Sequence, residues 1–330
     1  MTGVTLLDTD AALWELAPEW EALWRRVPDA SPFAAPAWLV PWWRHFGTSA
    51  PRVAVQRCAG RLTGVLPLYR LDERSVCKLL PIGAGISDHL DALLEPGVAA
   101  GPLLQAALDR ARMDGMDVCD LINVPPGSAL HGISPAGWRM TWGTGEPCPV
   151  LALPRSAADL VNVVPGKTLR KLRMNRNRAS RAGGWTIETA SPETVHSLLG
   201  HLVRLHQARW TTQGEAGVFA DPALLAFHNE AAPALLRAGI LRLQVLRLGD
   251  AVAAACYTLL AGTRRILFYL SGFDAGHAFV SPGSLLLAGM IEQAIAEGRH
   301  EADFLLGNEG YKAAWGAIDR SNRWCRLVPE

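Results

Sequence analysis

The feature that most constrains the fold is a strand–helix–strand pattern near the C-terminus. Residues 265–270 form an apolar run typical of a buried strand, and residues 302–306 form a second one. Between them, Ser281 and Pro282 suit a helix start, while Gly298 suits the position just past a helix end. The sequence therefore predicts a strand, a helix, a second strand and then a short helix.

The predicted helix has one apolar face and an open N-terminus. Its apolar positions recur at helical spacing and predict a buried stripe: Leu285, Leu286, Met290, Ile291, Ala294 and Ile295. The first backbone N–H groups of a helix have no partner within the helix. The loop before Leu285 is therefore a candidate anion site.

Two similar hairpins predict that the chain contains an internal repeat. Residues 52–57 and 61–68 flank Gly60, and residues 241–248 and 251–257 flank Gly249. In each half a helical segment precedes the hairpin, and a strand–helix–strand pattern comes after it. We expect two domains of one fold, residues 1–155 and 156–330.

Composition indicates an ordinary globular protein. Hydrophobic residues make up 49% of the 330 residues, charged residues 19%, and the net charge is +1. This charge gives no overall attraction to nucleic acid or membrane, so any basic surface must be local. The six cysteines form no C-x-x-C pair, and no signal-peptide pattern or spanning apolar run is present. We expect a cytoplasmic protein without a membrane partner.

The strongest local charge feature is a basic run with no acid among its cations. Seven cations fall within residues 167–181: Lys167, Arg170, Lys171, Arg173, Arg176, Arg178 and Arg181. Repulsion among them favours an anionic partner, such as a phosphorylated acceptor, the phosphates of a coenzyme, or tRNA. The alternative is a solvated helix beside acidic side chains from elsewhere in the fold.

Several motifs resemble one acyltransferase family along most of the chain. They are S-P-G at residues 281–283, D-F-x-x-G at 303–307 and Y-K-x-x-W at 311–315, with weaker matches at residues 31–38 and 66–68. The sequence resembles the CelD/BcsL-type acetyltransferases, a branch of the GNAT superfamily related to the Fem-type aminoacyl ligases. The resemblance implies an α+β fold of two tandem GNAT-like domains, each a mixed, mostly antiparallel sheet flanked by helices.

The resemblance also implies a place for acetyl-CoA or another acyl-CoA as co-substrate. In GNAT folds two neighbouring parallel strands separate and the pantetheine lies between them, which points here to residues 265–271 and 302–306. The coenzyme diphosphate would then meet the helix N-terminus. The candidate donor-binding residues are Ser281, Gly283, Ser284, Leu285, Tyr269 and Ser271. The motif here has fewer glycines than the usual GNAT loop.

Four residues are candidates for catalysis of acyl transfer to an amine. Asp303 or Glu309 could accept the amine proton, and Tyr311 could protonate the leaving thiolate. Lys312 could stabilise negative charge, as the lysine of a similar motif assists transfer in the Fem-type ligases. Asp303 could equally be a structural carboxylate, and Tyr311 could be a packing residue.

Acceptor-binding candidates lie in the first half and in the basic run. Asp88 resembles a family position and could bind an acceptor hydroxyl or amine, or could instead form a turn. Arg170 and Arg173, from the basic run at residues 167–181, are candidates for binding the acceptor. Trp38 belongs to a tryptophan-rich segment that is either core or a wall facing the substrate.

The combined expectation is an acyl-CoA-dependent N-acyltransferase, with the donor held by the second domain. The expected acceptor is an amino sugar, a nucleotide-linked sugar or an amino-acid-like molecule, and no metal is expected. A Fem-type ligase that uses aminoacyl-tRNA and a non-catalytic scaffold of the same fold are the alternatives. The chain is expected to be a monomer or a homodimer.

Overall fold

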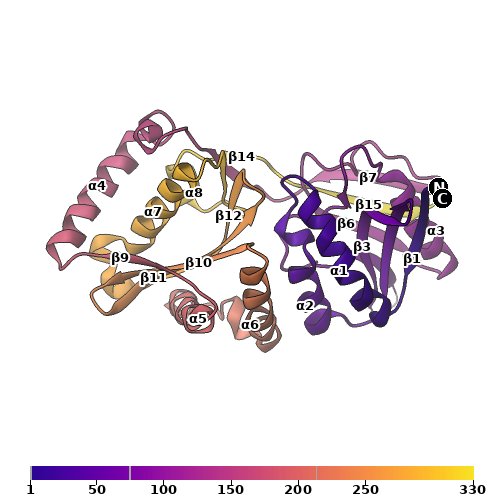
Figure 1. Cartoon of the computed structure of the whole chain (residues 1–330), viewed down its shortest axis with the longest axis horizontal. Coiled ribbons are helices and arrows are strands. Elements are labelled where there is room, and N and C mark those ends of the chain that lie inside the picture. The colour runs from indigo at the N-terminus through magenta and orange to yellow at the C-terminus, as the bar shows by residue number, and fades with distance from the viewer. Residues whose placement is uncertain (1, 74–75, 213) are drawn as a thin grey trace. The chain divides into compact units, whose positions relative to one another are not determined.

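The computed structural model describes residues 2–73, 76–212 and 214–330, and the chain divides into two compact units. The first comprises Met1–Pro147 with Arg320–Glu330, and the second comprises Cys148–Asp319. Each unit is a mostly antiparallel sheet flanked by helices, so the predicted α+β class is confirmed (Figure 1). In this described part of the chain, no helix has the length and apolarity needed to cross a membrane.

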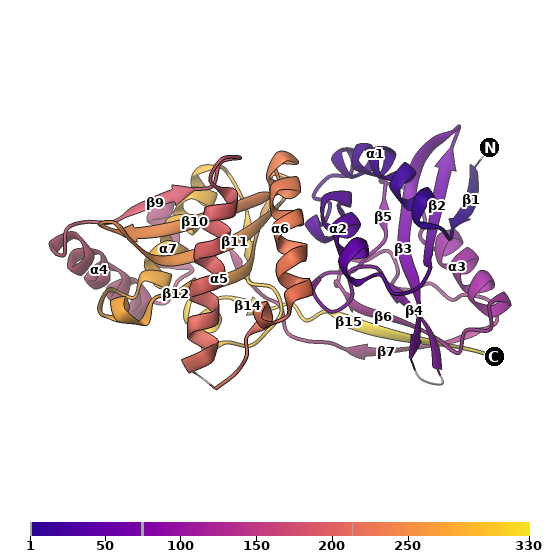
Figure 2. The same cartoon turned by 90° about the horizontal axis from the view of Figure 1, so that it is seen from below.

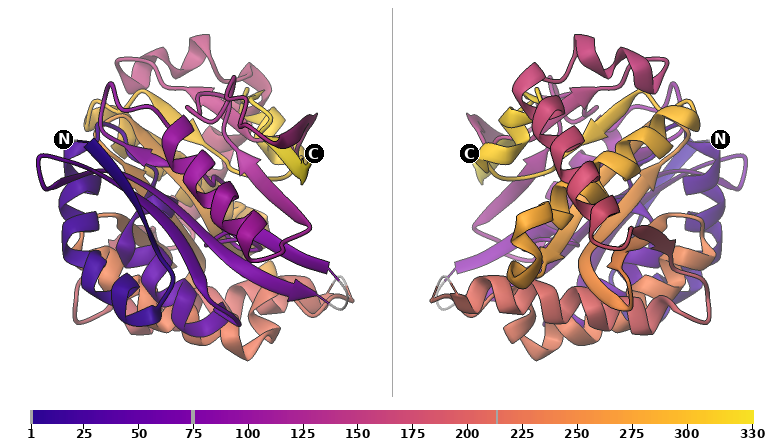
Figure 3. Two further views of the ribbon diagram at one scale, coloured as in Figure 1. Left: turned by 90° about the vertical axis from the view of Figure 1, so that its right-hand side faces the viewer. Right: turned by 90° about the vertical axis from the view of Figure 1, so that its left-hand side faces the viewer.

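The helices and strands of the first unit follow in chain order from β1 to β7, and β15 joins them from the C-terminal segment. They are β1 (Thr2–Leu7), α1 (Asp10–Arg26), η1 (Pro32–Ala34), α2 (Pro36–Phe46), β2 (Pro51–Cys58), β3 (Arg61–Glu73), β4 (Val76–Pro81), β5 (Leu93–Leu94), α3 (Gly101–Met113), β6 (Val118–Val124), β7 (Trp138–Thr144) and, from the C-terminus, β15 (Arg323–Pro329). The sheet order is β1-β2-β3-β4-β6-β15-β7, with β5 paired to β3. Figure 2 shows β15 between β6 and β7, and the left view of Figure 3 shows α3 in front of the sheet.

The second unit begins with a strand that lies inside its own sheet. Its elements are β8 (Pro149–Ala152), η2 (Ala157–Asn162), α4 (Gly166–Arg181), β9 (Thr186–Thr189), α5 (Val195–Thr212), η3 (Val218–Ala220), α6 (Pro222–Arg237), β10 (Leu241–Leu248), β11 (Ala251–Ala261), β12 (Arg265–Phe273), η4 (Ala275–Val280), α7 (Pro282–Ala296), β13 (Glu301–Asp303), α8 (Gly310–Ala314) and β14 (Ile318–Asp319). The sheet order is β14-β8-β13-β12-β11-β10-β9. Figure 1 shows α5 and α6 on one face of this sheet, with α7 and α4 on the other.

The unit boundaries differ from the predicted division at residues 155 and 156. Strand β8 falls in the second unit because it pairs with β13 and β14. Strand β15 falls in the first unit because it pairs with β6 and β7, although it ends the chain. Both assignments come from pairing between distant segments, which local sequence patterns do not encode.

The repeated order of elements confirms the predicted internal repeat. Each unit contains a strand, a helix, a 3₁₀ turn, a helix, a hairpin, and then a strand–helix–strand unit. The hairpin turns place Gly60 and Gly249 at positive φ, 81° and 57°, a conformation that glycine adopts at little cost. Each hairpin also has a register shift, between Gln56 and Arg57 in one and between Leu246 and Arg247 in the other.

Helix α7 packs as its periodicity predicts. Its six predicted core residues are all buried, between 0% and 5% exposed, and they join the core of the second unit. At Gly289 the helix lies close to β9, because a Cβ there would be 2.4 Å from the Ile187 side chain. This packing fixes the position of the α7 N-terminus on its face of the sheet.

Candidate functional site

The second unit contains a parallel strand pair whose pairing ends early. Strands β12 and β13 pair in parallel from Arg265 and Glu301 to Leu267 and Asp303, while β12 continues to Phe273. The hydrogen-bonded contact therefore ends well before β12 does. The predicted pair of neighbouring parallel strands is confirmed, with β13 shorter than expected.

A bulge in β12 lies beside the point where the two strands part. On the other side of β12, Tyr257 pairs with Leu270 while Thr258 pairs with Phe268, so Tyr269 is an extra residue. An extra residue bends a strand and increases its twist. The bend comes directly after Leu267, the last β12 residue paired with β13. Sequence reasoning did not identify this bulge, and no glycine or proline marks it.

Two candidate donor-binding residues lie on β12 beyond the paired region. Tyr269 is half-buried, with its ring 5.7 Å from that of His228 and 5.8 Å from that of Tyr257. Ser271 is exposed. The structure therefore brings Tyr269 into an aromatic cluster and leaves Ser271 accessible.

The N-terminus of α7 differs in detail from the predicted cap. Ser281 occupies the N-cap in a left-handed conformation, φ 50°, and its side chain makes no capping hydrogen bond. Its carbonyl accepts hydrogen bonds from the N–H groups of Ser284 at 3.0 Å and Leu285 at 3.2 Å. Leu285 is also buried in the core, so neither its side chain nor its amide is free for a ligand. Two of the predicted anion-binding amides are thus already bonded.

At this helix end, the backbone N–H of Gly283 can still donate a hydrogen bond to a ligand. Pro282 has no N–H, and no described residue accepts a hydrogen bond from the Gly283 N–H. A Cβ at Gly283 would lie 3.5 Å from Phe273, an ordinary contact. The protein itself therefore does not require glycine here, whereas close approach of a ligand to the backbone would.

Lys312 is a buried cation surrounded by oxygens. Its side chain is 2% exposed and its ammonium lies 2.8 Å from the carboxylate of Glu309. The ammonium also donates to three consecutive carbonyls, at 3.3 Å to Leu305, 2.7 Å to Leu306 and 3.2 Å to Gly307. An ammonium has three N–H donors, so protein oxygens occupy all of them. This geometry makes Lys312 a positioning residue for the loop after β13, and its predicted direct role in transfer stays a prediction.

The loop held by Lys312 is strained and tightly built. Leu305 has φ 56°, which a leucine rarely adopts, and its N–H donates to the Asp303 carboxylate at 2.9 Å. Gly307 has φ 110°, and a Cβ there would lie 2.6 Å from Glu309. Asp303 is 3% exposed and supports this turn, whereas Glu309 is half exposed. Glu309 is therefore the more accessible of the two candidate proton acceptors.

Tyr311 lies on α8 beside the strand opening. Its ring contacts that of Phe304 edge-to-face at 6.0 Å, and Phe304 stacks on Phe268 at 5.3 Å. Although Tyr311 is 41% exposed, the pKa of its phenol is raised, first by burial and then by the negative charge of Glu309. The phenol is therefore protonated at neutral pH and can donate a proton. Burial likewise raises the pKa of the Cys256 thiol, to about 12, so this cysteine is no nucleophile.

The basic run forms helix α4, which packs beside α7 and η4. Arg176 pairs with Glu292 of α7 at 2.7 Å, and Arg178 donates to the carbonyl of Phe279 at 3.2 Å. Arg170 and Arg173 are exposed. The predicted role of Arg170 and Arg173 in acceptor binding stays a prediction.

The candidates in the first unit have different environments. Trp38 is fully buried and donates to the Ser87 hydroxyl at 2.9 Å, so it is a core residue with no surface for a substrate. Asp88 is half-buried, and its carbonyl accepts a hydrogen bond from Asn322 at 2.6 Å. The role of Asp88 in acceptor binding stays a prediction.

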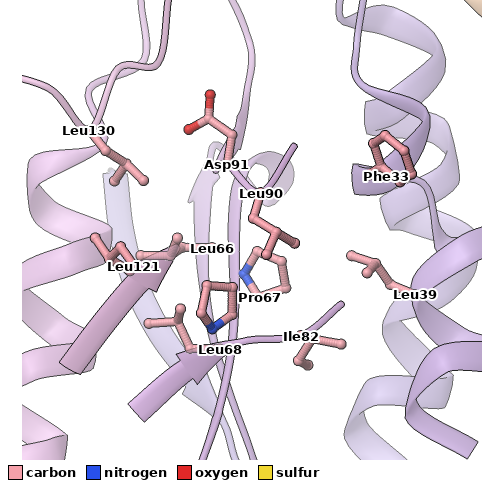
Figure 4. Close-up of a pocket in the computed structure, with 11 residues that line it drawn as sticks. Phe33, Leu39, Leu66, Pro67, Leu68, Ile82, Leu90, Asp91, Leu121 and Leu130 are labelled. Atoms are coloured by element: carbon pink, nitrogen blue, oxygen red, sulfur yellow. The ribbon is translucent and has the colours of Figure 1, made fainter. Parts of the chain in front are cut away.

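The first unit also has a parallel pair, and a small cavity lies beside it. Lys78 and Leu79 of β4 pair with Val118 and Cys119 of β6. The cavity has a volume of about 10 Å³, enough for about one water molecule. Figure 4 shows its lining, which is apolar except for one carboxylate: Phe33, Leu39, Leu66, Pro67, Leu68, Pro81, Ile82, Leu90, Asp91, Leu121 and Leu130. Side chains therefore fill the space beyond this strand pair.

Comparisons with known proteins agree on the fold. The family model described as "Acetyltransferase (GNAT) domain" matches residues 166–313. No curated protein matches the sequence. No cluster of His, Cys, Asp or Glu able to hold a metal ion occurs among the described residues.

Three solved structures resemble nearly the whole chain. FemX is 12% identical with a TM-score of 0.67, covering 94% of this chain and 95% of its own. A conserved protein of unknown function from Bacteroides thetaiotaomicron is 10% identical with a TM-score of 0.62, covering 98% and 100%. The C-terminal domain of a putative lysylphosphatidylglycerol synthetase from Agrobacterium fabrum is 13% identical with a TM-score of 0.59, covering 96% and 92%. At these identities the likeness concerns the fold, and the match to the acetyltransferase (GNAT) domain model is confined to residues 166–313.

Proposed function

We propose that this chain is an acyl-CoA-dependent N-acyltransferase whose second unit binds the donor. The observation that carries the proposal is the early end of the β12–β13 pairing on the same sheet that supports the α7 N-terminus. The match of residues 166–313 to the acetyltransferase (GNAT) domain supports it. The proposed acceptor is the primary amine of an amino sugar, a nucleotide-linked sugar or an amino-acid-like molecule.

The residues around the opening suit the two ends of an acyl-CoA. The Gly283 amide and the positive end of the α7 dipole suit a diphosphate, and the exposed Ser271 lies on the unpaired part of β12. Bound there, an acyl-CoA would supply the thioester whose C–S bond breaks as the amide bond forms. In this proposal Ser284 lies next to the diphosphate, whereas Leu285 packs in the core and holds the start of α7 in place.

Proton transfers would fall to the loop and to α8. The accessible carboxylate of Glu309 would accept the proton lost by the amine, with Asp303 holding the loop turn. Tyr311, protonated at neutral pH, would return a proton to the leaving sulfur. Lys312 would keep the loop carbonyls in place and so fix the positions of Glu309 and Tyr311.

The first prediction tests donor binding through Gly283. Wild-type protein should melt at higher temperature with acetyl-CoA, by about 2.7 kcal/mol of added stability at one hundred times the dissociation constant. Gly283→Ala should melt like wild type without ligand, because its Cβ has room in the protein, and should lose at least about tenfold in affinity. Thermal shift measures both quantities.

Gly200→Ala is the matched control, since Gly200 is an exposed position on α5 with open space around it. It should keep the full acetyl-CoA shift. An unaltered shift in Gly283→Ala, or no shift in wild type, would contradict the proposed donor site. A shift with total tRNA and none with acetyl-CoA would favour the aminoacyl-tRNA-dependent ligase, and a shift with neither would favour the scaffold.

A further inference from the structure

Helix α4 presents a basic outer surface that the proposed reaction does not use. Six of its cations are exposed: Lys167, Arg170, Lys171, Arg173, Arg178 and Arg181. Arg176 is the one α4 cation with an ion-pair partner among the described residues, Glu292. Among the described residues, an acidic ion-pair partner is therefore found for one of the seven cations, and the other six face solvent.

The opposite side of α4 packs against the rest of the second unit. Leu172, Asn175 and Ala179 are buried at 7%, 1% and 0% exposure, and they mark the side turned toward the core of the unit. The right view of Figure 3 shows α4 crossing in front of α7. The exposed cations therefore lie on the sides of α4 away from these buried residues, and Arg178 also reaches the Phe279 carbonyl of η4.

Exposed apolar side chains accompany these cations. Met174 on α4 is 43% exposed, Val161 just before α4 is 69% exposed, and Phe279 is 53% exposed. Phe279 adjoins α4 because its carbonyl accepts the hydrogen bond from Arg178. Cations mixed with exposed apolar groups are the combination found on surfaces that dock to lipid headgroups.

We propose that the outer surface of α4 binds an anionic lipid surface through headgroup phosphates. Each exposed Lys or Arg contributes about a fivefold gain in binding to such a surface, so six give a sizeable attraction. A nucleic acid is the less suitable partner, because α4 itself has no aromatic side chain and the exposed ring beside it, Phe279, would give bases little area for stacking. The surface would hold the second unit against the headgroups without crossing the membrane.

Vesicle cosedimentation tests this binding without any activity assay. Wild-type protein should bind vesicles of phosphatidylcholine containing phosphatidylglycerol and should not bind pure phosphatidylcholine. Added salt should weaken the binding, because exposed charges are screened. Arg170→Gln combined with Arg181→Gln should lower the vesicle affinity roughly 25-fold.

The matched control is Arg139→Gln with Arg237→Gln, which removes two exposed arginines outside α4. It should bind within about twofold of wild type, and circular dichroism should show both variants folded. Equal losses in both double variants, or no binding of wild type at low salt, would overturn the proposal. Binding of total tRNA instead of vesicles, lost in the α4 variant, would also overturn it and assign the surface to nucleic acid.

Discussion

The two parallel strand pairs of this chain share a topology, but the antiparallel strands beside them pair differently. In the first unit, β3 and β4 keep one register from Leu68 and Pro81 to Glu73 and Val76. In the second unit, the corresponding β11–β12 pairing contains the bulge at Tyr269. The bulge lies directly beside the point where the parallel strands part, and the described first-unit pairing has none.

The chain that leaves each strand pair differs as well. In the first unit a glycine-rich loop folds back, and Leu90 and Ile82 from this loop line the small cavity. In the second unit a short 3₁₀ turn leads to Ser281 and the start of α7. The comparison teaches that two units with the same strand order can differ in the pairing beside the parallel strands and in the segment that follows them.

The largest expected effect concerns the loop of the second unit. Lys312→Met should lower the free energy of unfolding by about 3–5 kcal/mol, because one buried and two partly buried carbonyls lose their shared donor. Urea denaturation measures this change. Lys171→Met removes an exposed lysine and should change stability by less than about 0.5 kcal/mol. Similar values for the two variants would show that the loop does not depend on Lys312.

A substitution beside the cavity of the first unit should lower stability without changing acetyl-CoA binding. Leu90→Ala enlarges the apolar cavity and should cost about 2–5 kcal/mol of unfolding free energy. It should leave the acetyl-CoA thermal shift unchanged, because the donor site is proposed for the second unit. An additional acetyl-CoA-dependent shift in this variant would show that the first unit can bind the donor once the Leu90 side chain no longer fills the space.

Acid should distinguish the two units by the sign of its effect. Burial lowers the pKa of His228 to about 3 and that of His206 to about 4 in the second unit. From pH 6.5 downward the unfolded chain therefore binds protons that the folded unit does not, so stability falls as pH falls. Each histidine should contribute about 2 kcal/mol of loss between pH 6.5 and 4.5.

Asp91 in the first unit acts in the opposite direction. Burial raises its pKa to about 6, so the folded unit binds the proton more tightly than the unfolded chain, and stability rises as pH falls from 6 toward 4. Urea denaturation at pH 6.5 and 4.5 should show a smaller pH dependence for His228→Phe than for wild type. His196→Gln, at an exposed position, should keep the wild-type dependence. An equal dependence in all three proteins would rule out His228 as a source of it.

Much of the fold could be predicted from local patterns, and much of the site could not. The bounds of α7, the hairpin turns and the repeated order of elements result from proline, glycines and apolar spacing. The environment of Lys312 does not, because its carbonyl partners belong to a loop whose shape only packing fixes. Trp38 likewise needed the structure to separate core from substrate wall.

The sequence by itself determined the element order, the repeat and the basic composition of α4, because each depends on residues close together in the chain. Only the tertiary structure decided that β15 completes the first sheet and that β8 enters the second. It also decided that β12 bends at Tyr269 and that six α4 cations have no acidic partner among the described residues. These outcomes depend on contacts between distant segments, where burial and pairing outweigh local preference.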